Sequence, residues 1–366
     1  MGMKGFKGFE KDFSCRGKQY EENTTYEEHG VGCYHKGVMH FCEDPWAVLD
    51  YYPLVNENGD ISEFAEVEAL GQVWDDCNKR ATNKLHIGAK LGLKGFLKAC
   101  IDFTLEKTKI ENFRSVSSGY ATQIGTSGDA TQIGTSGDDT QIGTSGYATQ
   151  IGTSGYATQI GTSGDATKIG TSGDATQIGT SGDATKIGTS GYATQIGTSG
   201  DATQIGTSGD RTKIGTSGYA TQIGTSGYAT KIGTSGYATK IGTSGYATKI
   251  GTSGDATKIG TSGDATKIGT SGYATQIGTS GDATQIGTSG DRTKINSTGK
   301  NTVIVCAGHG CIAKAKKGSW ITLSEWEKNF VEKRYIPVCV KTEYVDGEKI
   351  KEDTYYTLEN GEFVEV

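Results

Sequence analysis

Apolar and polar positions recur every nine residues from Gly119 to Thr298, across half of the chain. The phrase Gly-(Tyr/Asp)-Ala-Thr-(Gln/Lys)-Ile-Gly-Thr-Ser occurs twenty times in succession without an insertion, and we number its residues one to nine. Position four is Thr and position six is Ile in every copy. A fixed short period over this length is the signature of a stacked-repeat architecture.

The residue at position five indicates which way the side chains point. It is Gln in eleven copies and Lys in nine, so it must face water, because an unpaired buried Lys is very costly. Side chains alternate along a strand, so positions four and six face inward. The pattern therefore predicts a short strand over positions four to six. In the first copy, Gly125, Ser127 and Gly128 would form the corner, where glycine adopts positive φ readily.

We expect a mainly β fold built around a β-solenoid. A nine-residue period would not keep Ile on one face of a helix, which excludes a helical repeat. A disordered linker would have no reason to keep every repeat at the same length. Two nonapeptides per coil would give ten coils spaced about 4.8 Å apart. The small inward residues Ala, Thr and Ile favour this two-sided form over a triangular one with three nonapeptides per coil. Stacked Thr side chains are expected to hydrogen-bond along the axis.

Two smaller units flank the repeats. Residues 1–110 are predicted to be an α+β domain that caps the solenoid. Within it, Asp44-Pro45 opens a helix that runs to Tyr52, residues 64–70 form a strand, and residues 91–105 form a second helix.

The solenoid itself is expected to span residues 111–307. Residues 308–366 are predicted to be a small antiparallel β cap with hairpin turns at Asp346-Gly347 and Asn360-Gly361. Caps are needed at both ends, because an uncovered strand edge templates aggregation.

Composition narrows the classes of partner. The chain has a formal net charge of −6, and the repeats carry twelve Asp against nine Lys and two Arg. This balance gives no strong nucleic-acid signal. No segment approaches the ~18 apolar residues of a membrane span, and the start has no signal-peptide core, so we expect a cytoplasmic protein. The eight Cys lie outside the repeats and are expected to be reduced thiols.

Several short segments outside the repeats carry a resemblance to a known family. They are Cys15-Arg16-Gly17, Gln19-Tyr20-Glu21, Met39-His40-Phe41-Cys42, Pro45, Val48-Leu49-Asp50-Tyr51-Tyr52, Ala65-Glu66-Val67-Glu68-Ala69-Leu70-Gly71 and Lys316-Lys317-Gly318-Ser319-Trp320. The chain resembles a family from phages and bacteria that has no established activity and joins a short amino-terminal domain, Ser-Gly-containing nonapeptides and a small β unit. The resemblance implies a bacterial or prophage origin, and hence a bacterial or phage-infected host cell.

One cluster has the residue types of a metal site. Cys33, His35, His40 and Cys42 lie within ten residues, around a turn centred on Gly37. Two Cys and two His could hold tetrahedral zinc, but the spacing is not that of a standard zinc finger. The favoured interpretation is a hairpin with two buried Cys and two incidental His, so we predict no metal and no other cofactor.

A second cluster is loosely similar to ADP-ribosyltransferases. In those enzymes an early Arg holds the dinucleotide and a later Glu orients the nucleophile, and the matching residues here would be Arg16, Glu66 and Glu68. The chain lacks a Ser-Thr-Ser strand between them. A surface-charged strand is therefore the favoured interpretation, and the enzyme is kept as an alternative.

The repeats themselves could form an active surface. Their period is that of the calcium-binding RTX roll, but the Gly-Gly-x-Gly-x-Asp pattern is absent. Stacked Thr would suit an ice-binding or ice-nucleating solenoid, yet Gln or Lys at position five interrupts a flat Thr face. Ice binding is kept as a second alternative.

The favoured hypothesis is a non-enzymatic scaffold whose long surface binds a protein partner. If a phage encodes the chain, the partner would be a host protein. The predicted binding surface consists of Tyr219, Tyr228, Tyr237, Tyr246, Lys213, Lys231, Lys249 and Lys267. The partner itself is unknown from the residues. Oligomers could form through the end caps or the Tyr-bearing face.

Overall fold

The structure is a computed structural model. It describes residues 2–33, 37–56, 60–76, 78–107, 115–117 and 119–366. The chain divides into two compact units, which are described separately here. The first comprises residues 1–56, 60–192 and 204–208, and the second comprises residues 57–59, 193–203 and 209–366.

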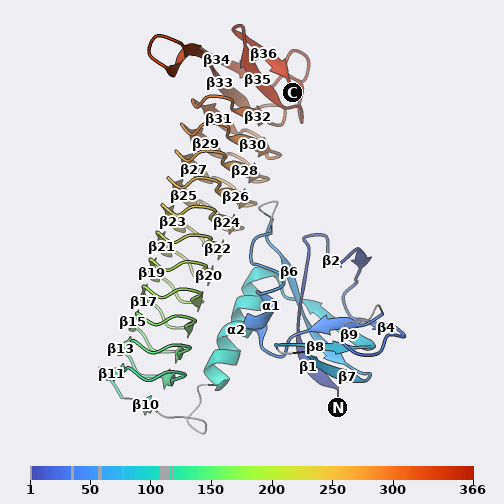
Figure 1. The fold of residues 1–366 in the computed structure, drawn as a ribbon, viewed down its shortest axis with the longest axis vertical. Coiled ribbons are helices and arrows are strands. Elements are labelled where there is room, and N and C mark those ends of the chain that lie inside the picture. Colours follow the sequence, from blue (N-terminus) through green and yellow to red (C-terminus); the bar gives the residue numbers. More distant parts are fainter. Residues whose placement is uncertain (1, 34–36, 57–59, 77, 108–114, 118) are drawn as a thin grey trace. The chain divides into compact units, whose positions relative to one another are not determined.

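The first unit begins with an α+β domain (Figure 1). A four-stranded antiparallel sheet has the order β1 (Met3–Phe9), β6 (Glu63–Ala69), β9 (Lys84–Lys90) and β4 (Thr24–Glu27). A three-stranded sheet has the order β5 (Met39–Phe41), β8 (Lys79–Thr82) and β7 (Val73–Asp76). The remaining elements are the hairpin β2 (Ser14–Cys15) and β3 (Lys18–Gln19), and the helices α1 (Pro45–Val48) and α2 (Gly92–Lys107).

The four-stranded sheet of this domain is covered on both faces. On one face, Phe64 of β6 stacks on Phe96 of α2, with ring centroids 3.8 Å apart. On the other face, Ala65 of the same strand packs in a second cluster with Phe9 and Phe41. Alternation along β6 therefore separates the two cores, as side-chain direction in a strand requires.

The helix predicted at Asp44-Pro45 is present but shorter than expected. The Asp44 carboxylate accepts a hydrogen bond from the Trp46 N–H at 2.9 Å, which caps the helix. The helix ends at Val48 with Leu49 as its C-cap, so it does not reach Tyr52.

The solenoid strands occupy positions five to eight of the nonapeptides, one strand per copy. In the first unit they are β11 (Gln123–Thr126), β12 (Gln132–Thr135), β13 (Gln141–Thr144), β14 (Gln150–Thr153), β15 (Gln159–Thr162), β16 (Lys168–Thr171), β17 (Gln177–Thr180), β18 (Lys186–Thr189) and β20 (Gln204–Thr207), preceded by β10 (Ser115–Ser117). In the second unit they are β19 (Gln195–Thr198), β21 (Lys213–Thr216), β22 (Gln222–Thr225), β23 (Lys231–Thr234), β24 (Lys240–Thr243), β25 (Lys249–Thr252), β26 (Lys258–Thr261), β27 (Lys267–Thr270), β28 (Gln276–Thr279), β29 (Gln285–Thr288) and β30 (Lys294–Ser297).

Within each unit, the solenoid strands pair in parallel with strands eighteen residues along the chain, as Ile214 does with Ile232 and Ile232 with Ile250. Odd-numbered strands form one sheet and even-numbered strands form the other. The solenoid has about eleven turns over residues 123–323. Two nonapeptides per coil are therefore confirmed, and neither the triangular form nor the disordered linker describes the chain.

The predicted faces are confirmed, but the corners differ from the prediction. In β23 the Ile232 and Thr234 side chains are buried and Lys231 is exposed. The positive φ falls on position three, for example 57° at Ala229, and not on the glycines at positions seven and one. The left-handed conformation costs a non-Gly residue about 1–2 kcal/mol. The Ala229 N–H donates to the Tyr246 carbonyl at 2.9 Å in the next coil, which helps to hold the corner.

The expected Thr ladder forms only in part. The Thr hydroxyl at position four donates a hydrogen bond within its own corner. For example, the Thr239 hydroxyl donates to the Gly236 carbonyl at 3.2 Å. At position eight, axial bonding joins Thr270 to Thr288 at 2.9 Å. Other position-eight hydroxyls are buried without a hydrogen-bond partner among the described residues, including Thr216, Thr225, Thr234, Thr243, Thr252 and Thr261.

A small β unit ends the chain, as predicted. The last solenoid strands, β31 (Val303–Cys306) and β32 (Ile312–Lys314), lead into β33 (Trp320–Asn329), β34 (Arg334–Tyr344), β35 (Tyr356–Glu359) and β36 (Glu362–Glu365). The β33 strand continues the solenoid by pairing in parallel with β31, and it pairs antiparallel with β34.

Only one of the two predicted hairpin turns in this unit joins paired strands. Asn360 and Gly361, with φ of 52° and 71°, join β35 to β36. The Asp346-Gly347 prediction is wrong, because these residues form a turn that follows β34 and is closed by the Gly347 N–H and the Ile350 carbonyl. No helix in the described part of the chain is both long enough and apolar enough to cross a bilayer.

Candidate functional sites

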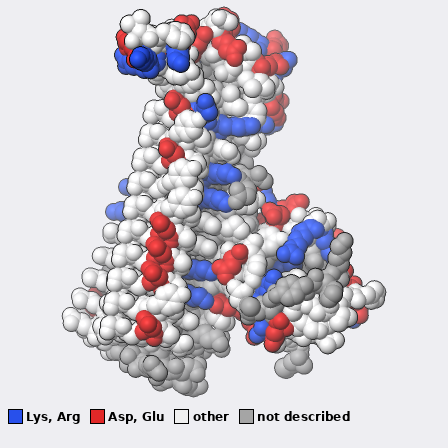
Figure 2. Space-filling view, viewed as in Figure 1, with Lys and Arg blue, Asp and Glu red and all other residues white. Residues whose placement is uncertain are grey.

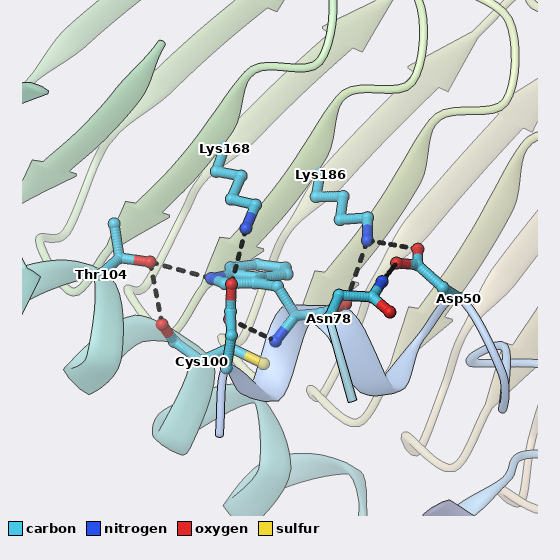
Figure 3. A network of polar contacts seen from close by, with 8 residues as sticks. Asp50, Asn78, Cys100, Thr104, Lys168 and Lys186 are labelled. Atoms are coloured by element: carbon cyan, nitrogen blue, oxygen red, sulfur yellow. Dashed lines mark hydrogen bonds and ion pairs between the residues drawn. The ribbon is translucent and has the colours of Figure 1, made fainter. Parts of the chain in front are cut away.

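The first unit contains a packing interface between the amino-terminal domain and the side of the solenoid. Helix α2 lies against strands β14, β16, β18 and β20. Figure 3 shows Lys168 and Lys186, both at position five, reaching from neighbouring strands toward α1. Lys168 pairs with Asp44 at 2.7 Å and Lys186 pairs with Asp50 at 2.8 Å.

Buried contacts accompany these ion pairs. The Trp46 indole N–H donates to the Thr104 hydroxyl at 2.9 Å, and Trp46 is 1% exposed. Glycine at position seven lets the Trp46 ring lie close to strand β18, because a Cβ at Gly188 would lie 2.9 Å from that ring. This lateral packing was not predicted from the sequence, in which position five was expected to face water in every copy.

The second unit carries the predicted binding surface. Lys213, Lys231, Lys249 and Lys267 are consecutive register partners on β21, β23, β25 and β27, and all four are exposed. Within the described part of the chain, none of the four has an ion pair. Neighbouring lysines about 4.8 Å apart repel by about 1 kcal/mol in water before salt screening and side-chain splaying reduce it. We call these four residues the lysine column.

Tyrosines at position two lie on the corners beside these strands. Tyr228 and Tyr246 stack with centroids 5.5 Å apart, and Tyr219 and Tyr237 stack at 5.4 Å. Each of the four rings is about half exposed. Tyr228 and Tyr246 precede Lys231 and Lys249 by three residues, so this pair flanks the middle of the lysine column.

Aspartates at position two have a structural use. The Asp210 carboxylate accepts from the Tyr228 N–H at 2.8 Å, and Asp255 accepts from the Tyr273 N–H at 2.7 Å. Figure 2 shows acidic side chains in a broken line on the visible face of the repeats, separated by uncharged residues. The four tyrosine rings and the four lysines of the column are exposed as well.

The amino-terminal domain contains a pocket of about 210 Å³. Its basic and acidic lining residues are Lys7, Arg16, Lys18, Glu28, His40 and Lys79, and its aromatic lining residues are Phe6, Tyr20, Phe41, Tyr51 and Tyr52. Cys15 also lines it, and its sulfur accepts from the Tyr52 hydroxyl at 3.0 Å and the Lys7 ammonium at 3.3 Å. These three residues come from separate elements, so the sequence analysis missed them as a group.

Glycines on β1 make room for the pocket walls. A Cβ at Gly8 would lie 2.4 Å from Tyr52, so this glycine lets the tyrosine approach the strand and reach Cys15. Burial raises the pKa values of Tyr20 and Tyr52, which keeps both phenols neutral. Four of the segments that carry the family resemblance line this pocket, a signal that the sequence analysis did not use.

The candidate zinc ligands do not converge among the described residues, and His35 lies outside them. The His40 Nε2 is 2.8 Å from the Cys33 carbonyl oxygen, while the Cys33 sulfur donates to the Asp75 carbonyl at 3.0 Å. Cys42 is buried beside Trp46, and burial raises the pKa of its thiol to about 12. No group of three or more His, Cys, Asp or Glu side chains in the described ranges could hold a metal ion.

The structure does not assemble the residues similar to those of ADP-ribosyltransferases. Arg16 lies in the β2–β3 turn and lines the pocket. Glu66 and Glu68 alternate with Val67 on β6, so they share the opposite face from the cluster that contains Cys15. The Thr side chains proposed for ice binding are also buried, at positions four and eight.

Comparison with known protein families gives a match to which no activity is attached. Residues 3–99 match the model of a family described as a domain of unknown function, DUF7666. This match covers most of the amino-terminal domain, ending within α2, and includes every described residue that lines the pocket. No curated protein and no solved structure is significantly similar to the chain.

Proposed function

We propose that the chain is a non-enzymatic scaffold whose solenoid binds an acidic protein partner. The observation that carries the proposal is the lysine column: four exposed ammonium groups in direct register and without ion pairs among the described residues. Carboxylates from a partner would relieve the repulsion along the column.

The neighbouring tyrosines add a second kind of contact. The stacked rings of Tyr228 and Tyr246 offer apolar area next to Lys231 and Lys249. Tyrosine is enriched among residues that dominate binding energy, because its large ring loses little conformational freedom. The partner segment is therefore expected to combine Asp or Glu with an apolar or aromatic residue and to run along the solenoid axis.

The test compares the full chain with a variant in which all four column lysines are Gln, the residue that other copies carry at this position. Binding of a fluorescent poly-glutamate peptide is measured by anisotropy over a salt series. We expect at least a tenfold weaker affinity for the Gln variant and a smaller salt dependence. The Gln variant should fold, because Gln occupies the same position in eleven copies.

Two further variants identify what the surface recognises. Replacing the four lysines with Arg keeps the charge and should keep most of the affinity. Replacing Tyr228 and Tyr246 with Ser should weaken capture of a natural partner from host lysate more than it weakens poly-glutamate binding. Peptide affinity that is equal for the wild-type and Gln chains at every salt concentration would remove the column from any binding role.

A further inference from the structure

The pocket of the amino-terminal domain contains a buried cation whose hydrogen bonding is incomplete. Lys7 is 5% exposed, and its ammonium donates to the Cys15 sulfur at 3.3 Å and to the His40 carbonyl at 3.0 Å. An ammonium has three donors, and the third has no oxygen, nitrogen or sulfur acceptor among the described residues. The ammonium also lies 5.6 Å from the Phe9 ring centroid and 5.5 Å from the Tyr20 ring centroid, so aromatic faces compensate part of its charge.

Arg16 brings a second positive charge to the same pocket. It forms the two-residue turn of the β2–β3 hairpin with Gly17, with φ of 52° and 78°. This turn type requires positive φ at both residues, a conformation that is unfavourable for a non-Gly residue such as Arg16. Arg16 is exposed, lines the pocket and has no ion pair in the described ranges.

The other charged groups do not neutralise these two. Glu28 is the only acidic residue among the described residues of the lining, and it is paired with Lys18. Lys79 adds a further cation, and its ammonium lies 5.0 Å from the Tyr51 ring centroid. Burial, followed by the nearby charges of Lys79, Lys7 and Arg16, lowers the pKa of His40.

The size of the pocket and the chemistry of its walls limit the class of ligand that it can hold. The pocket of about 210 Å³ is larger than a ~150 Å³ cavity that holds benzene, and smaller than the roughly 300–1,000 Å³ that encloses drug-sized molecules. Tyr20, Tyr52 and Phe41 supply flat apolar walls.

From these observations we propose that the pocket binds a small molecule with one planar ring and one compact oxyanion, a carboxylate or a phosphate. Lys7 and Arg16 hold the oxyanion, through the free ammonium donor and the unpaired guanidinium. Arginine suits this role because its planar fork matches the geometry of both oxyanions. The ring occupies the space between the aromatic walls. The site rests on different residues from the lysine column, so the two proposals are tested independently.

Calorimetric titration of the full chain with benzoate, phenyl phosphate and the neutral benzamide tests the proposal. At least one anion should bind ten times more tightly than benzamide. Arg16→Gln and Lys7→Met should each reduce anion affinity at least tenfold, whereas Arg16→Lys should retain more affinity than Arg16→Gln. Arg334→Gln serves as the matched control, because Arg334 is exposed, lies in the carboxy-terminal unit and does not line the pocket.

A second measurement protects the test against misfolding of the Lys7→Met variant. Cys15 is 8% exposed and lines the pocket, so the bound anion should slow its alkylation by iodoacetamide in the wild-type chain. Alkylation of Cys339 should be unchanged by the ligand, because this residue does not line the pocket. Equal affinity for benzamide and both anions, failure of both anions to bind at millimolar concentration, or unchanged anion affinity in Arg16→Gln would overturn the proposal.

Discussion

At the scale of single residues, the two glycines of each nonapeptide meet different demands. At position one, neighbouring coils approach so closely that a Cβ on Gly236 would lie 1.9 Å from the Gly218 carbonyl oxygen. At position seven of an odd-numbered strand, Gly233 has no atom within 4 Å of the place a Cβ would occupy. The first glycine is therefore required by stacking, whereas the second has no steric reason at this site.

Replacing these two glycines separately with Ala tests that distinction. Gly236→Ala should lower the free energy of unfolding by about 1–3 kcal/mol, because the backbone must shift to remove the overlap. Gly233→Ala should be neutral or raise it by about 0.5–1 kcal/mol, because Ala loses less conformational freedom in a strand. Chemical denaturation of both variants measures the difference. Similar losses in the two variants would show that stacking distance is not the reason for position one.

At the scale of elements, the glycine at position seven has a steric role where α1 and α2 cover the even-numbered strands of the first unit. Gly188 faces the Trp46 ring and Gly206 faces Leu97, whose side chain would lie 2.0 Å from an added Cβ. A flat strip without side chains lets the helices lie close to the strands. The flanking lysines then reach past this strip to Asp44 and Asp50.

A valine at this strip should separate the helices from the solenoid. Gly188→Val should displace Trp46, break its bond to Thr104 and lower the free energy of unfolding by about 1–3 kcal/mol. Hydrogen exchange should become faster in α2. The control Gly179→Val lies on β17, where an added Cβ has no neighbour within 4 Å, and it should leave α2 protected. If hydrogen exchange in α2 were unchanged in Gly188→Val, this strip of glycines would not be what allows the helices to pack against the solenoid.

The elements also show why some features were predictable and others were not. The Ile at position six and the exchange of Gln for Lys at position five were enough to predict the strand faces. The positive φ of Ala229 was missed, because nothing local marks Ala as a left-handed residue. The pocket was not predicted for another reason: Lys7, Cys15 and Tyr52 belong to three separate segments and become neighbours only when the domain folds.

At the scale of the whole molecule, eighteen residues form the unit of construction. Strands β21, β23 and β25 repeat the same register at this spacing, and so do β22, β24 and β26. The free energy of unfolding of such an array is approximately the sum of the intrinsic stability of each coil and the interface energy between neighbouring coils. One coil should therefore be removable without changing how the others stack, provided that the chain stays in phase.

Deleting residues 227–244, which include β23 and β24, tests this property. The deletion joins Ser226 to Gly245, so β25 takes the place of β23 and every later strand stays in its own sheet. We expect full strand content by circular dichroism and only a small decrease in the unfolding temperature, because one coil interface is lost. Deleting residues 227–239 instead removes thirteen residues and leaves Ser226 directly before Lys240, without the corner residues that turn the chain. This second variant should lose cooperative unfolding and become sensitive to proteolysis near residue 240. If both deletions were tolerated equally well, the stacking would not depend on phase, and the eighteen-residue coil would not be the unit that stabilises this protein.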